Sequence, residues 1–102
     1  IEALNKAHRY DECIRFLRKM MQRYPEEASL RKKAAGIYAE MGRKGLMHLS
    51  MAEYYHLMQA NETALEQLNL ARREKDTTFY DHSLIDVHER EWKEEVKEAK
   101  KR

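Results

Sequence analysis

The segment MAEYYHLMQANETALEQLNLAR, residues Met51–Arg72, decides the fold class of this chain. It contains two runs of apolar residues at helical spacing, separated by the tripeptide Gln59-Ala60-Asn61. Small side chains occur where two such helices would touch, at Ala52, Ala64 and Ala71. Because two helices approach closely only where a small side chain faces a large one, the segment predicts a helical hairpin. Such a unit indicates a binding or docking module rather than a catalyst.

The composition of the whole chain also favours helices. Its 102 residues include only three glycines and one proline, with 37% charged and 42% hydrophobic residues. The 20 basic and 18 acidic residues give a net charge of +2, and the two signs are interspersed. A nucleic-acid binder usually carries a basic stripe, so nucleic acid is not the expected partner. The sequence has no apolar run of about 18 residues, so no membrane-spanning helix is expected.

The first quarter of the chain is expected to hold the end of one helix and the whole of the next. Residues Ile1–Ala7 would finish a helix and His8-Arg9-Tyr10 would form a turn. A new helix would begin at Asp11, whose carboxylate suits a helix N-terminus, and end before Pro25. Cys13, the only cysteine, is expected to be a small buried contact residue. The apolar stripe of this helix consists of Cys13, Phe16, Leu17, Met20 and Met21.

Glycine and asparagine mark the boundaries of the middle helices. After Pro25, Glu26 and Glu27 lead into the next helix, and Gly42 predicts a left-handed cap at its end. Gly45 is expected to close the short loop that follows. A third helix should then run over residues 46–58. Asn61 is a good N-cap for a fourth helix over residues 61–74.

The last helix is expected to open at Asp76 or Thr77, either of which can cap it. If this helix continues to the end of the chain, it is expected to be about 35 Å long and longer than the other helices. Trp92 should anchor it, because the charged pairs four residues apart contribute only about 0.2–0.5 kcal/mol each. Its apolar stripe consists of Phe79, Tyr80, Leu84, Ile85, His88, Trp92, Val96 and Ala99.

The expected fold is therefore all-α, an antiparallel array of five to six helices in hairpins with a long C-terminal capping helix. One domain covers residues 1–102. Residues 1–25 would form a partial first repeat and residues 26–58 an irregular second unit. A third hairpin, residues 46–75, shares its first helix with the second unit, and residues 76–102 form the capping helix.

Two sets of residues carry a family resemblance. The first is an order of small, large and small residues followed by a proline, which resembles the tetratricopeptide repeat. It aligns Cys13, Leu17, Met20 and Pro25 with Ala64, Leu68, Ala71 and Asp76. The second set resembles the C-terminal tetratricopeptide region of BepA-like periplasmic zinc metalloproteases, although Leu84 and His88 stand where that family usually has arginines. It comprises Gly42, Ala52-Glu53-Tyr54, Glu66-Gln67-Leu68 and the segment Phe79–His88.

This resemblance implies a non-catalytic docking domain of a secreted protease. Such a domain would pack on the protease domain and recruit envelope proteins or outer-membrane assembly partners in the periplasm. The segment His88–Trp92 begins like the zinc-binding motif His-Glu-x-x-His, but Trp92 replaces the second histidine ligand. Zinc is therefore expected only in a catalytic domain upstream of Ile1, and no cofactor is expected in this chain.

A different class of function is also compatible with the residues. The chain would then be a free-standing cytoplasmic scaffold that holds a peptide or helix in the concave groove of its array. A third and weaker alternative is RNA binding, since basic residues cluster in the first two helices. No aromatic stacking platform is interleaved with them. This basic cluster consists of Arg15, Arg18, Lys19, Arg23, Arg31, Lys32 and Lys33.

Two sets of residues are the predicted contact surfaces for a protein partner. The first is expected to line the concave groove, because the first helix of each tetratricopeptide pair faces it. The second lies on the capping helix and is expected to dock on a neighbouring domain. The groove set is Lys32, Ala39, Glu40, Leu49, Glu53, His56 and Leu57. The docking set is Tyr80, Leu84, His88 and Trp92.

Neither a metal site nor a particular oligomer follows directly from the motifs. Glu53 and His56 have the spacing found in di-metal helical bundles, but no second pair faces them, so a polar surface pair is expected.

The apolar residues Ile1, Ala3, Leu4 and Ala7 would lack a preceding repeat to cover them. Dimerisation or domain swapping of the isolated chain is the consequence we predict.

Overall fold

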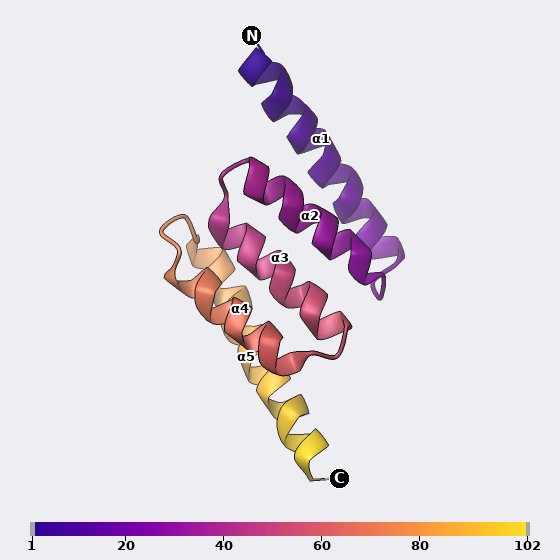
Figure 1. The fold of residues 1–102 in the computed structure, drawn as a ribbon, viewed down its shortest axis with the longest axis vertical. Coiled ribbons are helices and arrows are strands. Elements are labelled where there is room, and N and C mark those ends of the chain that lie inside the picture. Colours follow the sequence, from indigo (N-terminus) through magenta and orange to yellow (C-terminus); the bar gives the residue numbers. More distant parts are fainter. Residues whose placement is uncertain (1, 102) are drawn as a thin grey trace.

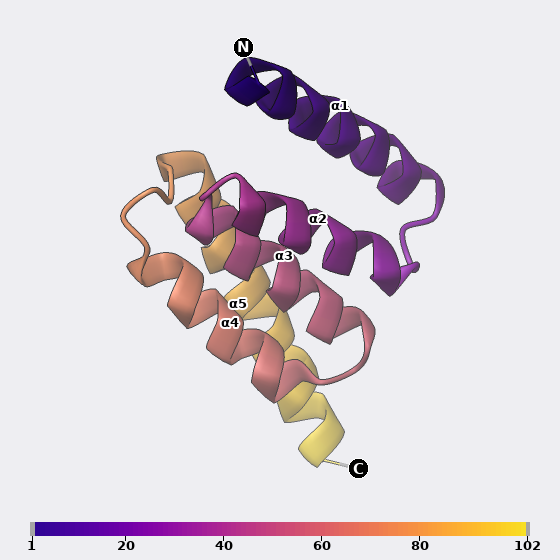
Figure 2. The same ribbon diagram turned by 45° about the horizontal axis from the view of Figure 1, so that its top comes forward.

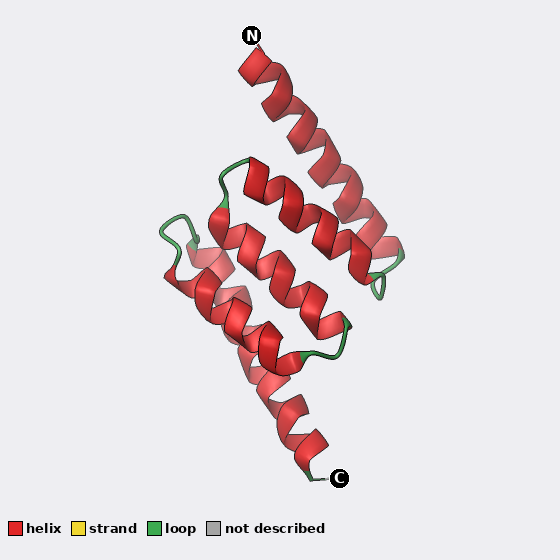
Figure 3. Ribbon diagram, in the orientation of Figure 1, coloured by secondary structure: helices red, strands yellow, loops and turns green. Residues whose placement is uncertain are grey.

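The computed structural model describes the backbone of residues 2–101 and the side chains of residues 6–101. Within this range the chain forms five helices and no strand, which confirms the all-α array of helical hairpins (Figure 3). The same range contains no helix that is both long and apolar enough to cross a membrane. The helices are α1 (Glu2–Arg23), α2 (Ala28–Glu40), α3 (Lys44–Leu57), α4 (Asn61–Arg73) and α5 (Phe79–Lys100).

The helices form an elongated array of 56 × 30 × 18 Å (Figure 1). Helices α2, α3 and α4 lie side by side and alternate in direction, and α1 flanks α2 at one edge. Helix α5 crosses behind α4 and also contacts α3, as the turned view shows (Figure 2). The central helix α3 therefore packs against three others, whereas α1 packs against α2 alone among the described helices. The division of the chain into repeat units stays a prediction.

Helix α1 differs from the expectation in two ways. It is continuous through His8-Arg9-Tyr10, so the expected turn there is wrong. Its buried residues are Ile14 and Leu17, each 6% exposed, whereas Cys13 is exposed and Phe16 is 62% exposed. The reason is register, because Ile14 and Leu17 point into the α1–α2 contact, whereas Cys13 and Phe16 lie at its exposed edge. The expected burial of Cys13 is wrong.

The predicted N-terminal apolar face consists mostly of residues whose side chains lie outside the described part of the chain. The side chains of Ile1, Ala3 and Leu4 fall outside the described residues, and Ala7 is exposed. The assembly predicted from this face therefore stays a prediction.

The three alanines at the predicted helix contacts of residues 51–72 lie in the main core. Ala52, Ala64 and Ala71 are fully buried, which confirms close contact of the helices at these small residues. Leu68 and Ile85 are the largest fully buried side chains and pack in the same cluster. A smaller cluster joins α1 to α2 and consists of Ile14, Leu17, Leu30, Ala34 and Tyr38.

Two helices of the array end in the same left-handed cap. Gly42 has a φ of +76°, as expected, and the Arg43 N–H donates to the Tyr38 carbonyl at 2.9 Å. After α3 the left-handed position is occupied by Gln59 with a φ of +64°, and the Ala60 N–H donates to the Tyr55 carbonyl at 2.8 Å. Gln59 therefore adopts a conformation that glycine adopts without a steric cost.

The starts of α4 and α5 lie elsewhere than expected. Asn61 is the first residue of α4 rather than its cap, and no side chain caps that helix. Thr78 caps α5 in a reciprocal capping box with Asp81, so the expected cap at Asp76 or Thr77 is wrong. Helix α5 has 22 residues, the same length as α1, because α1 is not interrupted.

Asp76 and Thr77, the expected cap residues, instead form hydrogen bonds to α3 and α4. The Gly45 N–H donates to Asp76 Oδ1 at 2.9 Å, and the Thr77 hydroxyl donates to the Ala71 carbonyl. Gly45 belongs to the first turn of α3 rather than to the loop before it. A Cβ at Gly45 would collide with the Thr77 side chain, so a glycine is needed where the α4–α5 loop meets α3.

Candidate functional site

Helices α1, α3 and α5 enclose a cavity of about 390 Å³ on one side of the array. Its apolar walls come from all three helices and from α2, and Leu49 forms part of its base. Tyr80 stands at its edge with 74% of its surface exposed. The lining residues are Ile14, Arg18, Met21, Ala34, Tyr38, Leu46, Leu49, Ser50, Glu53, Tyr80, Asp81 and Leu84.

A second hollow continues this cavity along α1. The two share Ile14, Arg18, Tyr38 and Leu46, and we call them together the inner groove. The further lining residues of the second hollow are His8, Asp11, Arg15, Met41 and Arg43.

The α1 end of the inner groove is basic. Arg18 donates to the Tyr38 hydroxyl at 3.1 Å, which holds its guanidinium at the groove. Among the described side chains, no carboxylate forms an ion pair with Arg15, Arg18 or Arg43. Asp11 is the acidic residue of this hollow, so positive charge predominates at this end.

The inner groove brings together four residues from the two predicted contact sets. Leu49 and Glu53 come from the groove set, and Tyr80 and Leu84 come from the docking set. Leu49 is buried in the core, so it supports the base of the groove rather than presenting a free surface.

The rest of the predicted groove set lies elsewhere. The Lys32 ammonium stands 5.5 Å from the centre of the Tyr54 ring, and Ala39 is exposed outside the groove. Glu40 lies in a hollow on the other side of α2, and Leu57 lines a hollow at the end of α3. None of these four residues lines the cavity that contains Leu49 and Glu53, so they do not form one surface with those two.

The remaining predicted residues form a cluster inside the α3–α5 contact. The rings of His56 and His88 lie nearly parallel to the indole of Trp92, each with its centroid 4.5 Å from the indole centroid. His88 Nε2 lies 3.1 Å from Glu53 Oε2, and His56 Nε2 lies 2.9 Å from Glu95 Oε2. We call these five residues the imidazole–indole cluster.

The imidazole–indole cluster makes α5 part of the fold. Each helix contributes one histidine and one glutamate, so the two pairs cross the interface in opposite directions. Trp92 is only 2% exposed, so its predicted role as a surface docking residue is wrong. His56 and His88 were also predicted to contact a partner. Their rings instead contact Trp92 and the carboxylates of Glu95 and Glu53 in the same chain. Stacked aromatic rings add about 0.5–1.5 kcal/mol beyond the burial of their area.

The cluster does not have the arrangement of a metal site. Among the side chains of residues 6–101, no group of three or more from histidine, cysteine, aspartate and glutamate is placed to hold a metal ion. Glu53 and His56 point to different partners on α5, although they are three residues apart on one helix. The absence of a cofactor stays a prediction.

Arg72 forms a second link between helices, which no sequence pattern indicates. Arg72 on α4 binds Asp86 at 2.9 Å and Glu89 at 3.2 Å on α5. The hydrogen bond to Asp86 and the nearby Glu89 raise the pKa of Arg72, although partial burial opposes this. Residues 14 or more positions apart leave no periodic signal, so only the crossing of α4 and α5 identifies the pair.

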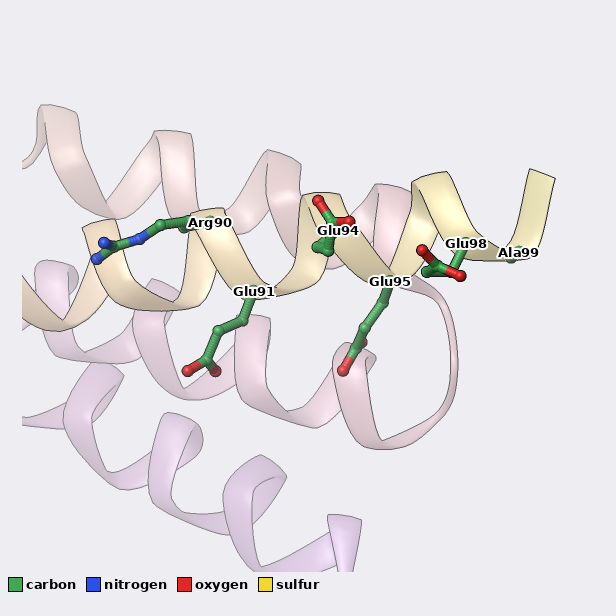
Figure 4. Close-up of a pocket in the computed structure, with 6 residues that line it drawn as sticks. All are labelled: Arg90, Glu91, Glu94, Glu95, Glu98 and Ala99. Carbon is green, nitrogen blue, oxygen red and sulfur yellow. The ribbon is translucent and has the colours of Figure 1, made fainter. Parts of the chain in front are cut away.

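The C-terminal half of α5 carries an acidic surface (Figure 4). One helix alone lines this hollow, with Glu91, Glu94, Glu95 and Glu98 spread along it. Glu95 is held by His56 and by the Asn61 amide at 3.3 Å. A hollow between side chains of a single helix lacks the walls of a binding site, so we assign no ligand to it.

No protein-family model, no curated protein and no solved structure matches this chain. The tetratricopeptide and protease resemblances therefore stay predictions.

Proposed function

We propose that this chain is a non-catalytic docking domain that binds a segment of another protein in the inner groove. The observation that carries the proposal is the apolar cavity between α1, α3 and α5 with the exposed Tyr80 at its edge. Exposed tyrosines beside apolar pockets are typical contact residues of protein interfaces. An array of helices with such a groove suits the binding of a partner's helix or extended segment.

The charge of the groove indicates the chemistry of the bound segment. Arg15, Arg18 and Arg43 lie at its α1 end, next to the apolar residues Ile14 and Leu46. A segment with apolar residues on one face and carboxylates beside them would complement both features. We therefore propose an acidic amphipathic segment as the ligand.

Two biological settings are compatible with this proposal. By its resemblance to BepA-like proteases, the chain would be the docking domain of a periplasmic zinc metalloprotease and would recruit envelope proteins or outer-membrane assembly partners. The alternative is a free-standing cytoplasmic scaffold with the same groove. The gene distinguishes them, since the first requires a signal peptide and a His-Glu-x-x-His motif upstream of Ile1.

The test selects peptides from a random displayed library against the whole chain. Enriched peptides should repeat apolar residues at helical spacing and carry Asp or Glu beside them. Tyr80→Ala and Arg15→Glu should each weaken their binding by about tenfold or more, as expected for central contact residues. Phe79→Ala is the matched control, because Phe79 is 89% exposed on the same helix outside the groove.

Three results would contradict the proposal. These are the absence of any enriched peptide, equal binding to the Tyr80→Ala and wild-type chains, and equal losses at Tyr80 and Phe79. Enrichment of basic rather than acidic peptides would overturn the proposed partner chemistry while leaving the groove in place.

A further inference from the structure

The two hollows of the inner groove meet at Arg18 and Tyr38. Both residues line the cavity between α1, α3 and α5, and both also line the second hollow along α1. Tyr38 is only 7% exposed and belongs to the α1–α2 cluster, so packing holds its ring in place. The Arg18 guanidinium donates to the Tyr38 hydroxyl at 3.1 Å. A guanidinium and the hydroxyl of a buried tyrosine therefore lie side by side at this junction.

The Arg18–Tyr38 pair keeps hydrogen-bond donors for a further acceptor. A hydroxyl that accepts a hydrogen bond still has its own proton to donate, and a guanidinium has five N–H groups. Among the described side chains, no carboxylate forms an ion pair with Arg18. Glu53 and Asp81 line the adjoining cavity, but a histidine of α5 and the backbone at the start of α5 already bind them. An oxyanion that satisfies these donors would therefore come from another molecule.

The charge of the second hollow matches a phosphate group better than a single carboxylate. Arg15, Arg18 and Arg43 carry three positive charges and Asp11 carries one negative charge, which leaves +2. His8 also lines this hollow, but a glutamate one turn further along α1 binds it. A phosphorylated residue carries a charge of about −1.5 to −2 at pH 7 and offers three acceptor oxygens. An aspartate or glutamate would leave part of the positive charge uncompensated.

We propose that the junction of the two hollows is a phosphate subsite that binds a phosphorylated residue of the partner segment. The phosphate oxygens would accept hydrogen bonds from the Arg18 guanidinium and the Tyr38 hydroxyl, while Arg15 and Arg43 supply further positive charge. Arginines bind phosphate with two parallel hydrogen bonds, and arginine clusters are a common means of recognising phosphorylated segments. The subsite rests on the proposed docking function, because the residues that flank the phosphate would occupy the apolar cavity.

Three synthetic peptide libraries test the subsite with the whole chain. Their members are random except at the central position, which is phosphoserine in one library, glutamate in the second and serine in the third. The phosphoserine library should bind the immobilised chain about tenfold more tightly than the other two, as expected for additional hydrogen bonds to a charged group. The bound fraction is measured by fluorescence over a range of chain concentrations.

Two conservative variants separate the subsite from a general effect of positive charge. Arg18→Lys keeps the charge but removes the planar group that binds phosphate through two hydrogen bonds. Tyr38→Phe keeps the buried ring and removes only the hydroxyl. Each variant should lower the preference for phosphoserine over glutamate, with the circular dichroism spectrum unchanged. Arg73→Gln is the matched control, because Arg73 is an exposed arginine on α4 outside the inner groove, and it should keep the full preference.

The outcomes distinguish the subsite from the docking function. Equal binding of the phosphoserine and glutamate libraries, with both weakened by Tyr80→Ala, would overturn the subsite and leave the docking groove in place. Binding of none of the libraries would contradict both proposals. A preference that survives in both Arg18→Lys and Tyr38→Phe would overturn the assignment to this junction. Binding to vesicles that contain phosphoinositides, without any preference for phosphoserine peptides, would replace the peptide by a membrane surface.

Discussion

Replacing glycine by alanine should change the stability of this fold in opposite directions at two positions in neighbouring helices. At Gly45 a Cβ would lie 3.0 Å from Asp76 Oδ1 and 3.3 Å from the Cα of Thr77, and it would collide with the Thr77 hydroxyl. At Gly36 the same atom would have nothing within 4 Å. The two sites therefore differ in packing, although both glycines lie within helices.

The magnitudes follow from two competing effects. Alanine is more favourable than glycine inside a helix by about 0.8–1 kcal/mol, so Gly36→Ala should raise the free energy of unfolding by nearly that amount. At Gly45 the gain is smaller because the residue lies in the first turn, and overpacking costs about 1–3 kcal/mol. Gly45→Ala should therefore lower the free energy of unfolding by about 1–2 kcal/mol, with a fall of about 4–8 °C in Tm for each kcal/mol.

Urea titrations followed by far-ultraviolet circular dichroism measure both changes, at concentrations low enough to keep the chain monomeric. Thr77→Ala removes the hydroxyl that the new Cβ would meet. The cost of Gly45→Ala should therefore be smaller in the Thr77→Ala background than in the wild-type background. Equal costs in the two backgrounds, or a Gly45→Ala chain more stable than wild type, would refute the close approach of α3 and the α4–α5 loop.

Three further predictions concern a cap, the core and alkaline pH. Gln59→Gly should raise the free energy of unfolding by up to about 1 kcal/mol in urea titration, because Gln59 has a φ of +64°. Trp92→Ala should lower it by about 3–5 kcal/mol, a large share of the stability of a domain, and an effect below 1 kcal/mol would contradict its burial. The hydrogen bond to Glu40 raises the pKa of Tyr10 in the folded chain above its ordinary value of 10.0. The stabilisation that this hydrogen bond gives the folded chain is therefore complete below pH 10.0 and is lost as the pH rises through the raised pKa. Tyr10→Phe should remove this part of the alkaline loss in urea titrations at successive pH values, whereas an unchanged pH profile would contradict it.

The sequence was most informative where a helix has neighbours on several sides. Ala52, Ala64 and Ala71 are fully buried as expected, because their spacing fixes one contact face of each helix. The same reasoning failed in α1, where two overlapping apolar stripes share Leu17. One stripe includes Cys13 and Phe16 and the other includes Ile14. Helix α1 packs against α2 alone among the described helices, so periodicity could not decide which stripe is buried.

The imidazole–indole cluster shows a second limit of sequence reasoning. Glu53 and His88 are 35 positions apart, and His56 and Glu95 are 39 apart. No local pattern records such pairs, because the crossing of α3 and α5 alone determines which side chains meet. Glu53, His56 and His88 were therefore predicted to contact an outside partner, whereas each of them contacts another side chain of the same chain.

The unequal anchoring of the two outer helices bears on how the inner groove works. Helix α5 is joined to α3 by the imidazole–indole cluster and to α4 by Arg72, so contacts with two helices position the wall that carries Tyr80 and Leu84. The opposite wall belongs to α1, whose contacts among the described helices are with α2 alone. The width of the groove is therefore set mainly by the small α1–α2 cluster.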